Sequence, residues 1–502
     1  MNGVRLSLYG LIFFSVFNFT SPLMGSIYIS SDLGGSSEII SYSVAFFGLG
    51  NAYSFPLARI LGARWGKAPA LLFFAILFLA TLFLCAWMPT FFLFNAIRFL
   101  SGFVCGVFFP LAVALLESIN TPKHKISFMA YLAFLVSITP VLGASFGGVV
   151  AYMYEWTWIF YLQIPFVCLS IFALRRNISI FKEQTTLAPF DTIGYISYMI
   201  CTGSWICFTS LGQELDWLRS PLIVTTLVTG LLSTPFFIIW ECKHKDPIID
   251  LSLFKIPNFA VSCLSVFFLF SAYFGMVILL AVWLHFDVNY TPNWIALLLL
   301  HMLIASICLF FYVLKWIKKV PPFLPVICAV FAFLFSCFYS TQFNAEIDFA
   351  RIAISRILAG FGLAFFFFPL FTICLDSLPE NKKSQGLAVF QSCRLVAGAL
   401  GVSFYHTLFI RRIVFYHDRL GSQLTLFNQN TKNFFHELSI FHQEGLKKPE
   451  LLDTALHKQS TALGLADCFY AMGWILTALC VFLILFALKS AKKQKTSPSL
   501  QG

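Results

Sequence analysis

The sequence predicts an all-α integral membrane protein with about fourteen transmembrane helices and both termini in the cytoplasm. Composition sets the class, since 59% of the 502 residues are hydrophobic, only 11% are charged, and mean hydropathy is +0.84. A soluble protein of this length could not cover its surface with so few charges. Apolar runs of about 20 residues, each long enough to cross a hydrocarbon core of about 30 Å, recur along the whole chain. We expect spanning helices at 7–29, 39–61, 68–88, 91–117, 127–151, 156–174, 189–211, 221–240, 259–284, 293–314, 321–341, 349–375, 386–409 and 463–488.

The charges between these runs predict the orientation of the helices. With the N-terminus inside, the cytoplasmic segments contain most of the 33 Lys and Arg residues, from Arg5 to the lysines that follow Lys489. The short outer loops contain only Arg219 and Arg351. This distribution obeys the positive-inside rule. It also accounts for the formal net charge of +11, so nucleic-acid binding is not expected.

An internal repeat divides the chain. Residues 98–118 are echoed by residues 356–377: each copy begins with an arginine, places a glycine four residues later (Gly102, Gly360), and continues to Phe-Phe-Pro-Leu. A half-chain period in apolar sequence is typical of duplicated transporters. The alternative is chance similarity between two Phe-rich helices.

Both copies lie in predicted helices that run from outside to inside, which gives a 6+2+6 plan. The expected units are an N-terminal six-helix bundle (1–188), two linking helices (189–245) and a C-terminal six-helix bundle (246–502). The last unit includes a mostly polar outer segment, 410–462, with Phe434, Phe435, Leu438 and Phe441 at helical spacing.

Arginines inside spanning helices are the most informative single residues. A charge at mid-bilayer costs at least a few kcal/mol and persists only beside a partner or a cavity. Arg98 shares one helix face with Gly102, so we expect a closely packed helix there and a guanidinium held near the bundle interior. The functional interpretation is contact with substrate or proton-relay groups, and the alternative is a structural arginine satisfied by backbone carbonyls. Arg356 and Arg394 are the other two such arginines.

The fifth predicted helix carries a second signal, a proline followed by three glycines. Pro140 cannot donate the helical hydrogen bond of its position, and Gly143, Gly147 and Gly148 permit close approach by a neighbouring helix. We therefore expect helix 5 to bend and pack closely at an interface between the two halves.

Together these stretches resemble the major facilitator superfamily, specifically its 14-helix drug:proton antiporters of the EmrB/QacA type. The resemblance rests on helix 4, on helix 5 with the following Trp156–Phe160 and Gln163–Pro165, on Asp191–Gly194, Gly212–Pro221, Asp246–Ala260 and Arg394–Gly401, and on the length of the outer segment. It implies the major facilitator fold, a bacterial inner-membrane location and rocking of the halves about a central cavity.

Two departures from the family pattern concern acidic residues. The loop between helices 2 and 3 keeps Arg64, Gly66 and Lys67 of the family's gating motif but has Ala63 where an acid belongs. In helix 1 the family often has an acid followed two residues later by threonine, whereas this chain has Asn18 and Thr20. An amide does not titrate at accessible pH, so another group must carry a coupled proton.

Few residues can replace the missing acid of helix 1. Asp467 is the one acid in the outer part of helix 14, where burial would favour its protonated form, and it is our first candidate. His301 in helix 10 is an alternative, although a lone membrane histidine is more often a packing residue. Glu117 and Asp376 lie at cytoplasmic helix ends, where solvated pairs with loop lysines are expected.

The predicted function is secondary active transport: proton-coupled export of amphipathic organic compounds or drugs. The alternative is import or export of a specific metabolite, such as a siderophore or another organic anion, since three buried arginines and no acid in helix 1 favour anions. Expected partners are a small-molecule substrate, protons, the lipid bilayer and, by resemblance, a periplasmic adaptor on segment 410–462. That segment has a simpler interpretation as a helical cap. No nucleotide-binding, metal-ligating or catalytic motif occurs, so neither an enzyme nor a cofactor is predicted.

Overall fold

A computed structural model describes residues 2–34, 40–120, 125–181, 185, 190–317, 319–379, 382–425, 427–440 and 447–496. The described residues form helices and turns and contain no strand. The predicted boundary at 188 and the side chain of Phe441 lie outside this part of the chain.

The helices follow the predicted order. The first half contains α1 (Asn2–Asp32), α2 (Ile40–Ser54), α3 (Leu57–Trp65), α4 (Lys67–Trp87), α5 (Phe91–Gly106), α6 (Phe108–Ile119), α7 (Lys125–Met153), α8 (Trp158–Tyr161) and α9 (Ile164–Arg176). Then come α10 (Thr192–Leu211) and α11 (Pro221–Lys243), followed by α12 (Pro257–Phe286), α13 (Pro292–Trp316), α14 (Phe323–Ser340), α15 (Phe349–Asp376), α16 (Lys383–Gly421), α17 (Gln429–Ile440) and α18 (Lys447–Thr496). Short 3-10 turns are η3 (Ile178–Ile180), η4 (Trp217–Arg219) and η5 (Leu251–Lys255).

The all-helical membrane prediction is confirmed, with less regular spans than expected. Within the described residues, 12 helical stretches are long and apolar enough to cross a membrane. The other two predicted spans correspond to α2 with α3, which are separated at Phe55-Pro56, and to α10, which is 20 residues long and rich in Ser and Thr. Pro56 lacks the N–H that a continuous helix needs, which explains the first interruption.

The two halves meet along two seams. On one side α7 packs against α13 and α15, and on the other α2 packs against α16. The linking helix α10 contacts both α2 and α16, and α11 packs on α10. Of α11, only Ile223, Gly230, Phe237 and Glu241 are buried. The linking pair therefore lies at the outside of the second seam, and the unit boundaries at 188 and 245 stay a prediction.

The repeated glycines make equivalent contacts in the two halves. A Cβ on Gly102 would collide with the backbone of Phe47 in α2, and a Cβ on Gly360 would collide with the backbone of Met302 in α13. Each glycine therefore lets the arginine-bearing helix of its half lie directly against a neighbouring helix.

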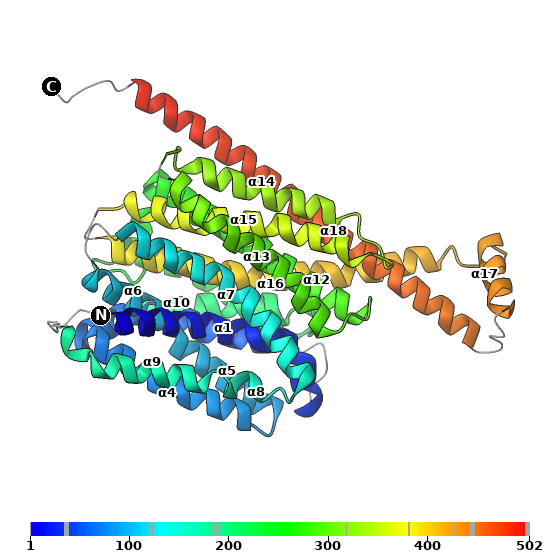
Figure 1. The fold of residues 1–502 in the computed structure, drawn as a ribbon, viewed down its shortest axis with the longest axis horizontal. Helices are drawn as coiled ribbons and strands as arrows, with labels where there is room; N and C mark the ends of the chain where they lie inside the picture. Colours follow the sequence, from blue (N-terminus) through cyan, green and yellow to red (C-terminus); the bar gives the residue numbers. More distant parts are fainter. Residues whose placement is uncertain are drawn as a thin grey trace.

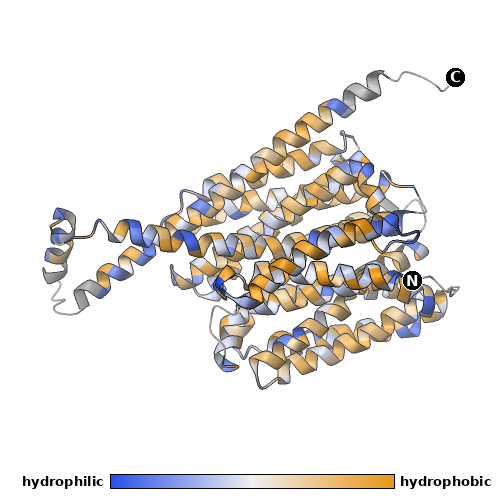
Figure 2. Cartoon of the chain, turned by 180° about the vertical axis from the view of Figure 1, so that it is seen from behind, coloured by the Kyte–Doolittle hydropathy of each residue, from blue (hydrophilic) through white to orange (hydrophobic). Residues whose placement is uncertain are grey.

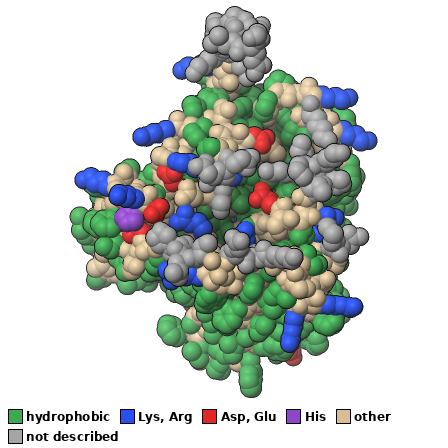
Figure 3. All heavy atoms as spheres, turned by 90° about the vertical axis from the view of Figure 1, so that its left-hand side faces the viewer, with side chains coloured by type: hydrophobic (Ala, Val, Ile, Leu, Met, Phe, Trp, Pro, Cys, Tyr) green, Lys and Arg blue, Asp and Glu red, His purple; other side chains and the backbone are tan. Residues whose placement is uncertain are grey.

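The bundle has two different ends. α1 begins and α18 ends at the same end, whereas α17 and the adjoining parts of α16 and α18 project from the opposite end (Figure 1). Hydrophobic residues dominate the length of the helices, and hydrophilic residues gather at the ends and on the projection (Figure 2). Lys and Arg side chains surround the end that carries the chain termini (Figure 3), as the positive-inside rule requires of a cytoplasmic face.

Candidate functional site

Arg98 is completely buried among three helices of the first half. Its Nη1 donates to Asn18 Oδ1 of α1 at 3.1 Å, and its Nε donates to Ser43 Oγ of α2 at 3.1 Å. Nη2 lies 3.5 Å from the carbonyl oxygen of Phe19, and Cζ lies 4.5 Å from the centre of the Phe47 ring. In the described part of the chain no ion pair involves Arg98. The cation is thus held by neutral groups.

Asn18 is the residue at which the family resemblance leads one to expect an acid, and its neighbours explain why an amide fits here. Its Oδ1 accepts from Arg98, while its Nδ2 donates to Ser101 Oγ at 2.9 Å. Both ends of the amide are therefore used, and Asn18 is fully buried. Thr20 follows Phe19 in the same turn of α1: its hydroxyl is 3.4 Å from the carbonyl oxygen of Phe17, and it packs against Gly143.

Arg394 borders a small cavity between the two halves. The volume open to the centres of water molecules is about 40 Å³. The cavity can therefore hold a few waters but no drug-sized compound. Arg394 Nε donates to Gln391 Oε1 at 2.6 Å, and Cζ lies 5.2 Å from the centre of the Phe270 ring. The remaining lining is mostly apolar and comes from both halves: Ile12, Ser15, Val16, Phe19, Phe47, Gly48, Asn51, Phe55, Cys105, Gly106, Phe109, Phe274, Leu395 and Gly398.

The Arg98 network is continuous with this cavity. Phe19 and Phe47 line the cavity, and the guanidinium of Arg98 lies over the Phe47 ring. The ring centres of Phe19 and Phe274, which belong to opposite halves, are 5.8 Å apart. Arg98 therefore lies next to an aromatic ring that borders the space between the halves. Among the lining residues Arg394 is the only charged one.

Arg356, the repeat equivalent of Arg98, is also completely buried but has a different environment. Its Nη2 donates to Ser355 Oγ at 3.0 Å and lies 3.4 Å from Ser340 Oγ, and its Nη1 lies 3.4 Å from the Met276 carbonyl oxygen. Ser336 extends this hydroxyl cluster. Arg356 therefore lies within the second half, away from the cavity that Arg394 borders.

The glycines of α7 fit closely against α1. A Cβ on Gly143 would meet Thr20 Oγ1, and one on Gly147 would meet the Ser21 carbonyl oxygen. The helix continues through Pro140 to Met153. This contact lies inside the first half rather than at the interface between halves.

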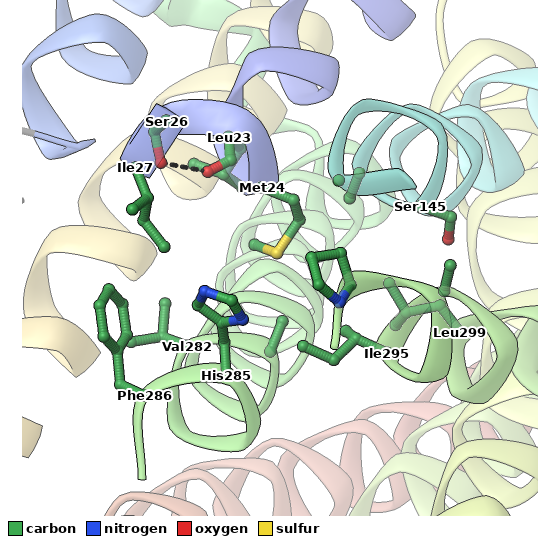
Figure 4. Close-up of a pocket in the computed structure, with 15 residues that line it drawn as sticks. Leu23, Met24, Ser26, Ile27, Ser145, Val282, His285, Phe286, Ile295 and Leu299 are labelled. Atoms are coloured by element: carbon green, nitrogen blue, oxygen red, sulfur yellow. Dashed lines mark hydrogen bonds between the residues drawn. The ribbon is translucent and has the colours of Figure 1, made fainter. Parts of the chain in front are cut away.

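Gly148, in contrast, faces the seam between the halves. A Cβ there would lie 3.1 Å from Met24 Cβ and 3.5 Å from Pro292 Cβ. Figure 4 shows the adjoining small pocket, in which Met24 from α1 faces His285 from α12 and Ile295 from α13. The pocket is lined by both halves and is nearly filled by side chains.

The loop between the second and third predicted spans is a single residue. Gly66, with φ of 86°, joins α3 directly to α4, which begins at Lys67. This left-handed backbone conformation favours glycine. Arg64 lies in the last turn of α3. The gating role of Arg64, Gly66 and Lys67 stays a prediction.

Asp467 lies at the base of the outer projection. Its Oδ2 is 2.9 Å from Arg412 Nε and accepts from the Tyr416 hydroxyl at 3.0 Å. Both partners belong to α16, so the carboxylate joins the two legs of the projection. The structure does not bring Asp467 together with Arg98 or Arg394. His301 is also remote from that network, since its Nδ1 contacts the carbonyl oxygen of Leu297 in its own helix at 2.8 Å.

A larger cavity, about 160 Å³, was not foreseen from the sequence. It lies where α10 meets both halves and is lined by Leu23, Val44, Thr209, Ser210, Gln213, Glu214, Ile278, Val282, Phe286, Val402, Ser403, His406 and Thr407. Glu214 accepts a hydrogen bond from the Tyr42 hydroxyl, and Ser210 Oγ lies 3.1 Å from Ser403 Oγ. A carboxylate and an imidazole thus share one polar cavity. Glu214 lies in the stretch Gly212–Pro221 that resembles the family pattern, but nothing in the sequence indicates that it lies near His406.

Comparisons with known proteins agree with this architecture. The sequence pattern of the Major Facilitator Superfamily matches residues 6–402. The chain is 28% identical over 471 residues to the fatty acid resistance protein FarB of Neisseria gonorrhoeae, covering 93% of this chain and 92% of that protein. It is 28% identical over 412 residues to the multidrug export protein EmrB of Escherichia coli strain K12, covering 82% and 80%.

Solved structures share the fold at low sequence identity. The Escherichia coli xylose transporter XylE matches with a TM-score of 0.55 and 11% identity, over 95% of this chain and 96% of that one. The human organic anion transporter MFSD10 matches with a TM-score of 0.55 and 12% identity, over 95% and 98%.

Proposed function

Because the chain belongs to the major facilitator superfamily, we propose that it exports amphipathic organic compounds across the bacterial inner membrane by alternating access, coupled to proton entry. It is a multi-pass transporter similar to multidrug export proteins, and it is not an enzyme.

The cavity beside Arg394 carries the proposal for the substrate. An amphipathic compound needs an apolar surface for its body and a polar group for its head. Because the cavity holds only a few waters in this conformation, such a compound would enter only when the halves separate. The rings of Phe19, Phe47 and Phe274 would then supply the apolar surface, and the guanidinium of Arg394 would supply a positive charge. Guanidinium groups pair well with carboxylates. This chemistry favours organic anions and neutral compounds over lipophilic cations.

A specific organic anion is the second candidate function. The relative named fatty acid resistance protein is consistent with a long-chain carboxylate, because such a molecule combines an apolar body with one negative charge. A siderophore or similar metabolite anion is the remaining alternative, and import is the alternative direction.

The coupling proton has a candidate route other than helix 1. Asn18 does not titrate, and Asp467 is ion-paired with Arg412 outside the central cavity. Glu214 and His406 face a cavity of about 160 Å³ that touches α10 and both halves, so their protonation would alter the contact between moving parts. Two buried arginines would hold helices in register: Arg98, with Asn18 and Thr20, in the first half, and Arg356 in the second half.

Gating movements would occur at the two seams between the halves. Gly143 and Gly147 keep α7 attached to α1, and Gly148 lets α7 slide against α13, with Pro140 in the same helix. Gly102 fixes α5 on α2. On the cytoplasmic side, the tight turn at Gly66, flanked by Arg64 and Lys67, would open and close with the first half.

The outer projection is a candidate adaptor surface. Arg412 and Asp467 join its legs, and His417 Nε2 lies 3.2 Å from Asp453 Oδ1. Phe427, between α16 and α17, is 91% exposed, which suits contact with another protein.

Transport by everted inner-membrane vesicles tests this function. The panel is a fluorescent long-chain carboxylate, a neutral dye of similar length and a lipophilic cation, each with and without a proton ionophore. We expect ionophore-sensitive uptake into everted vesicles. Arg394→Gln should reduce carboxylate transport about tenfold more than neutral-dye transport, since a charged hydrogen bond is worth about 1.5–3 kcal/mol. Arg219→Gln, at an exposed outer position, is the matched control.

The outcomes separate the alternatives. Uptake that survives the ionophore would exclude proton coupling, and uptake into right-side-out vesicles would reverse the direction. An equal loss for all three compounds in Arg394→Gln would show that the residue is structural and would remove the anion argument.

A further inference from the structure

Two acidic side chains meet where the linking helices reach the cytoplasmic face. Asp191 precedes α10, and Glu241 lies in the last turn of α11; they are 7% and 3% exposed. A Cβ on Gly194 would meet both Asp191 Oδ2 and Glu241 Oε1, so the two carboxyl groups face each other across this glycine. Glu241 is also one of the few buried residues of the otherwise exposed α11.

The hydrogen bonds of the pair leave one atom without a partner. Asp191 Oδ1 accepts from the Gly194 amide, and Oδ2 accepts from Trp240 Nε1, both at 2.9 Å. Glu241 Oε2 accepts from the Ile249 amide at 2.9 Å, whereas the buried Glu241 Oε1 has no hydrogen-bond partner. This oxygen points toward a carboxylate, which can only accept.

No cation nearby balances two negative charges. In the described part of the chain, neither carboxylate forms an ion pair with Lys or Arg, and no cluster of three or more metal-ligating groups occurs. His244 Nδ1 lies 3.6 Å from Asp191 Oδ2 and is about one-third exposed. Lys243 and Lys245 of the same helix end are exposed, and Asp250 of the following segment is paired with Lys382. Two buried carboxyl groups that both lie against one glycine are not both ionised without a counter-charge.

We propose that Asp191 and Glu241 form a proton-binding site. One proton from the cytoplasm binds to Glu241 Oε1, which then donates to Asp191 Oδ2, so the pair carries a single negative charge. The inference does not depend on the substrate or on coupled export.

The bound proton fastens the linking helices to the second half. It joins the start of α10 to the end of α11, while Glu241 Oε2 retains the segment 246–256 through the Ile249 amide. Asp250 of that segment is bonded to Lys382, at the start of α16, at 2.8 Å. Release of the proton would place two like charges together and loosen this connection.

Infrared spectroscopy of the purified full-length protein in liposomes tests the site. The wild type minus Glu241→Gln difference spectrum at neutral pH should contain a carboxylic acid C=O band that disappears as the pH is raised. Glu155→Gln, at an exposed outer position, should give no such band. Absence of the band from the Glu241→Gln difference would overturn the proposal, as would a band abolished by a bound metal cation.

Thermal unfolding provides a second readout. The folded pair holds its proton to higher pH than the unfolded chain does. Wild-type stability should therefore fall as the pH rises above the ordinary titration range of a carboxyl group, until the folded pair has released its proton, and should not change further above that pH. Glu241→Gln keeps a neutral donor and should lose this pH dependence while remaining as stable as wild type at neutral pH. Asp191→Asn replaces an acceptor of Trp240 Nε1 by a donor and should be less stable throughout. If Glu241→Gln does not fold, or is as unstable as Asp191→Asn, the pair does not share a proton.

Discussion

Replacing Asn18 by aspartate changes one charge beside the buried Arg98. In the wild type the Arg98 guanidinium donates to a neutral amide, with Nη1 3.1 Å from Asn18 Oδ1. In Asn18→Asp the same oxygen becomes part of a carboxylate, and the Ser101 hydroxyl, now an acceptor from Asn18 Nδ2, can rotate to donate instead. The substitution is nearly isosteric, so any change in stability reflects electrostatics.

The magnitude follows from two opposing contributions. With an effective dielectric constant of about 20, the attraction of unit charges at this separation is about 5 kcal/mol. Desolvation of the new carboxylate costs several kcal/mol. Arg98 is already buried, so only one new ion must be desolvated. We expect a net gain in unfolding free energy of about 1–2 kcal/mol.

Thermal or denaturant unfolding in detergent, arranged as a double-mutant cycle, measures this contribution. Asn18→Asp should stabilise the protein when Arg98 is present and destabilise it in an Arg98→Gln background, because the carboxylate is then buried without a cation. Equal effects in the two backgrounds would show that Arg98 does not act on position 18. The reasoning would also fail if Asn18→Asp were destabilising on its own.

The other predictions concern a helix contact and a cytoplasmic ion pair. Gly147→Leu should prevent folding or severely reduce stability, because the side chain would overlap the Ser21 backbone. The yield of detergent-solubilised protein and its size-exclusion profile measure this loss. A wild-type yield and profile would contradict the α1–α7 contact. Gly3→Leu, with no atom within 4 Å of the added Cβ, is its control. For Asp250, burial acts to raise the pKa, but hydrogen bonds from Lys382 and Ser252 outweigh it and hold the pKa below its usual value. This stabilisation is present at neutral pH and is lost as the pH falls through the folded-state pKa. Lys382→Met should therefore lower the free energy of unfolding at neutral pH by about 0.5–1 kcal/mol and reduce its decline at acidic pH. Lys319→Met is the control and should do neither.

Sequence reasoning succeeded for properties that a single segment of the chain determines. The order of the helices and the superfamily follow from hydropathy and local motifs, whereas the cytoplasmic location of both termini stays a prediction from the charge bias. These properties depend on transfer of single helices into lipid, which each segment decides largely by itself. The expectation that Arg98 faces the bundle interior also followed from its helix face, but its partners did not.

Only the tertiary structure decided which distant polar groups meet. It placed Asn18 against Arg98, Glu214 and His406 in one cavity, and Asp191 against Glu241, and it separated Asp467 from all of them. Helical period indicates the face on which a residue lies but not the helix that covers this face. That choice depends on packing of small residues such as Gly102, Gly147 and Gly194 across the whole bundle, because lipid-exposed helices gain little from hydrophobic burial alone.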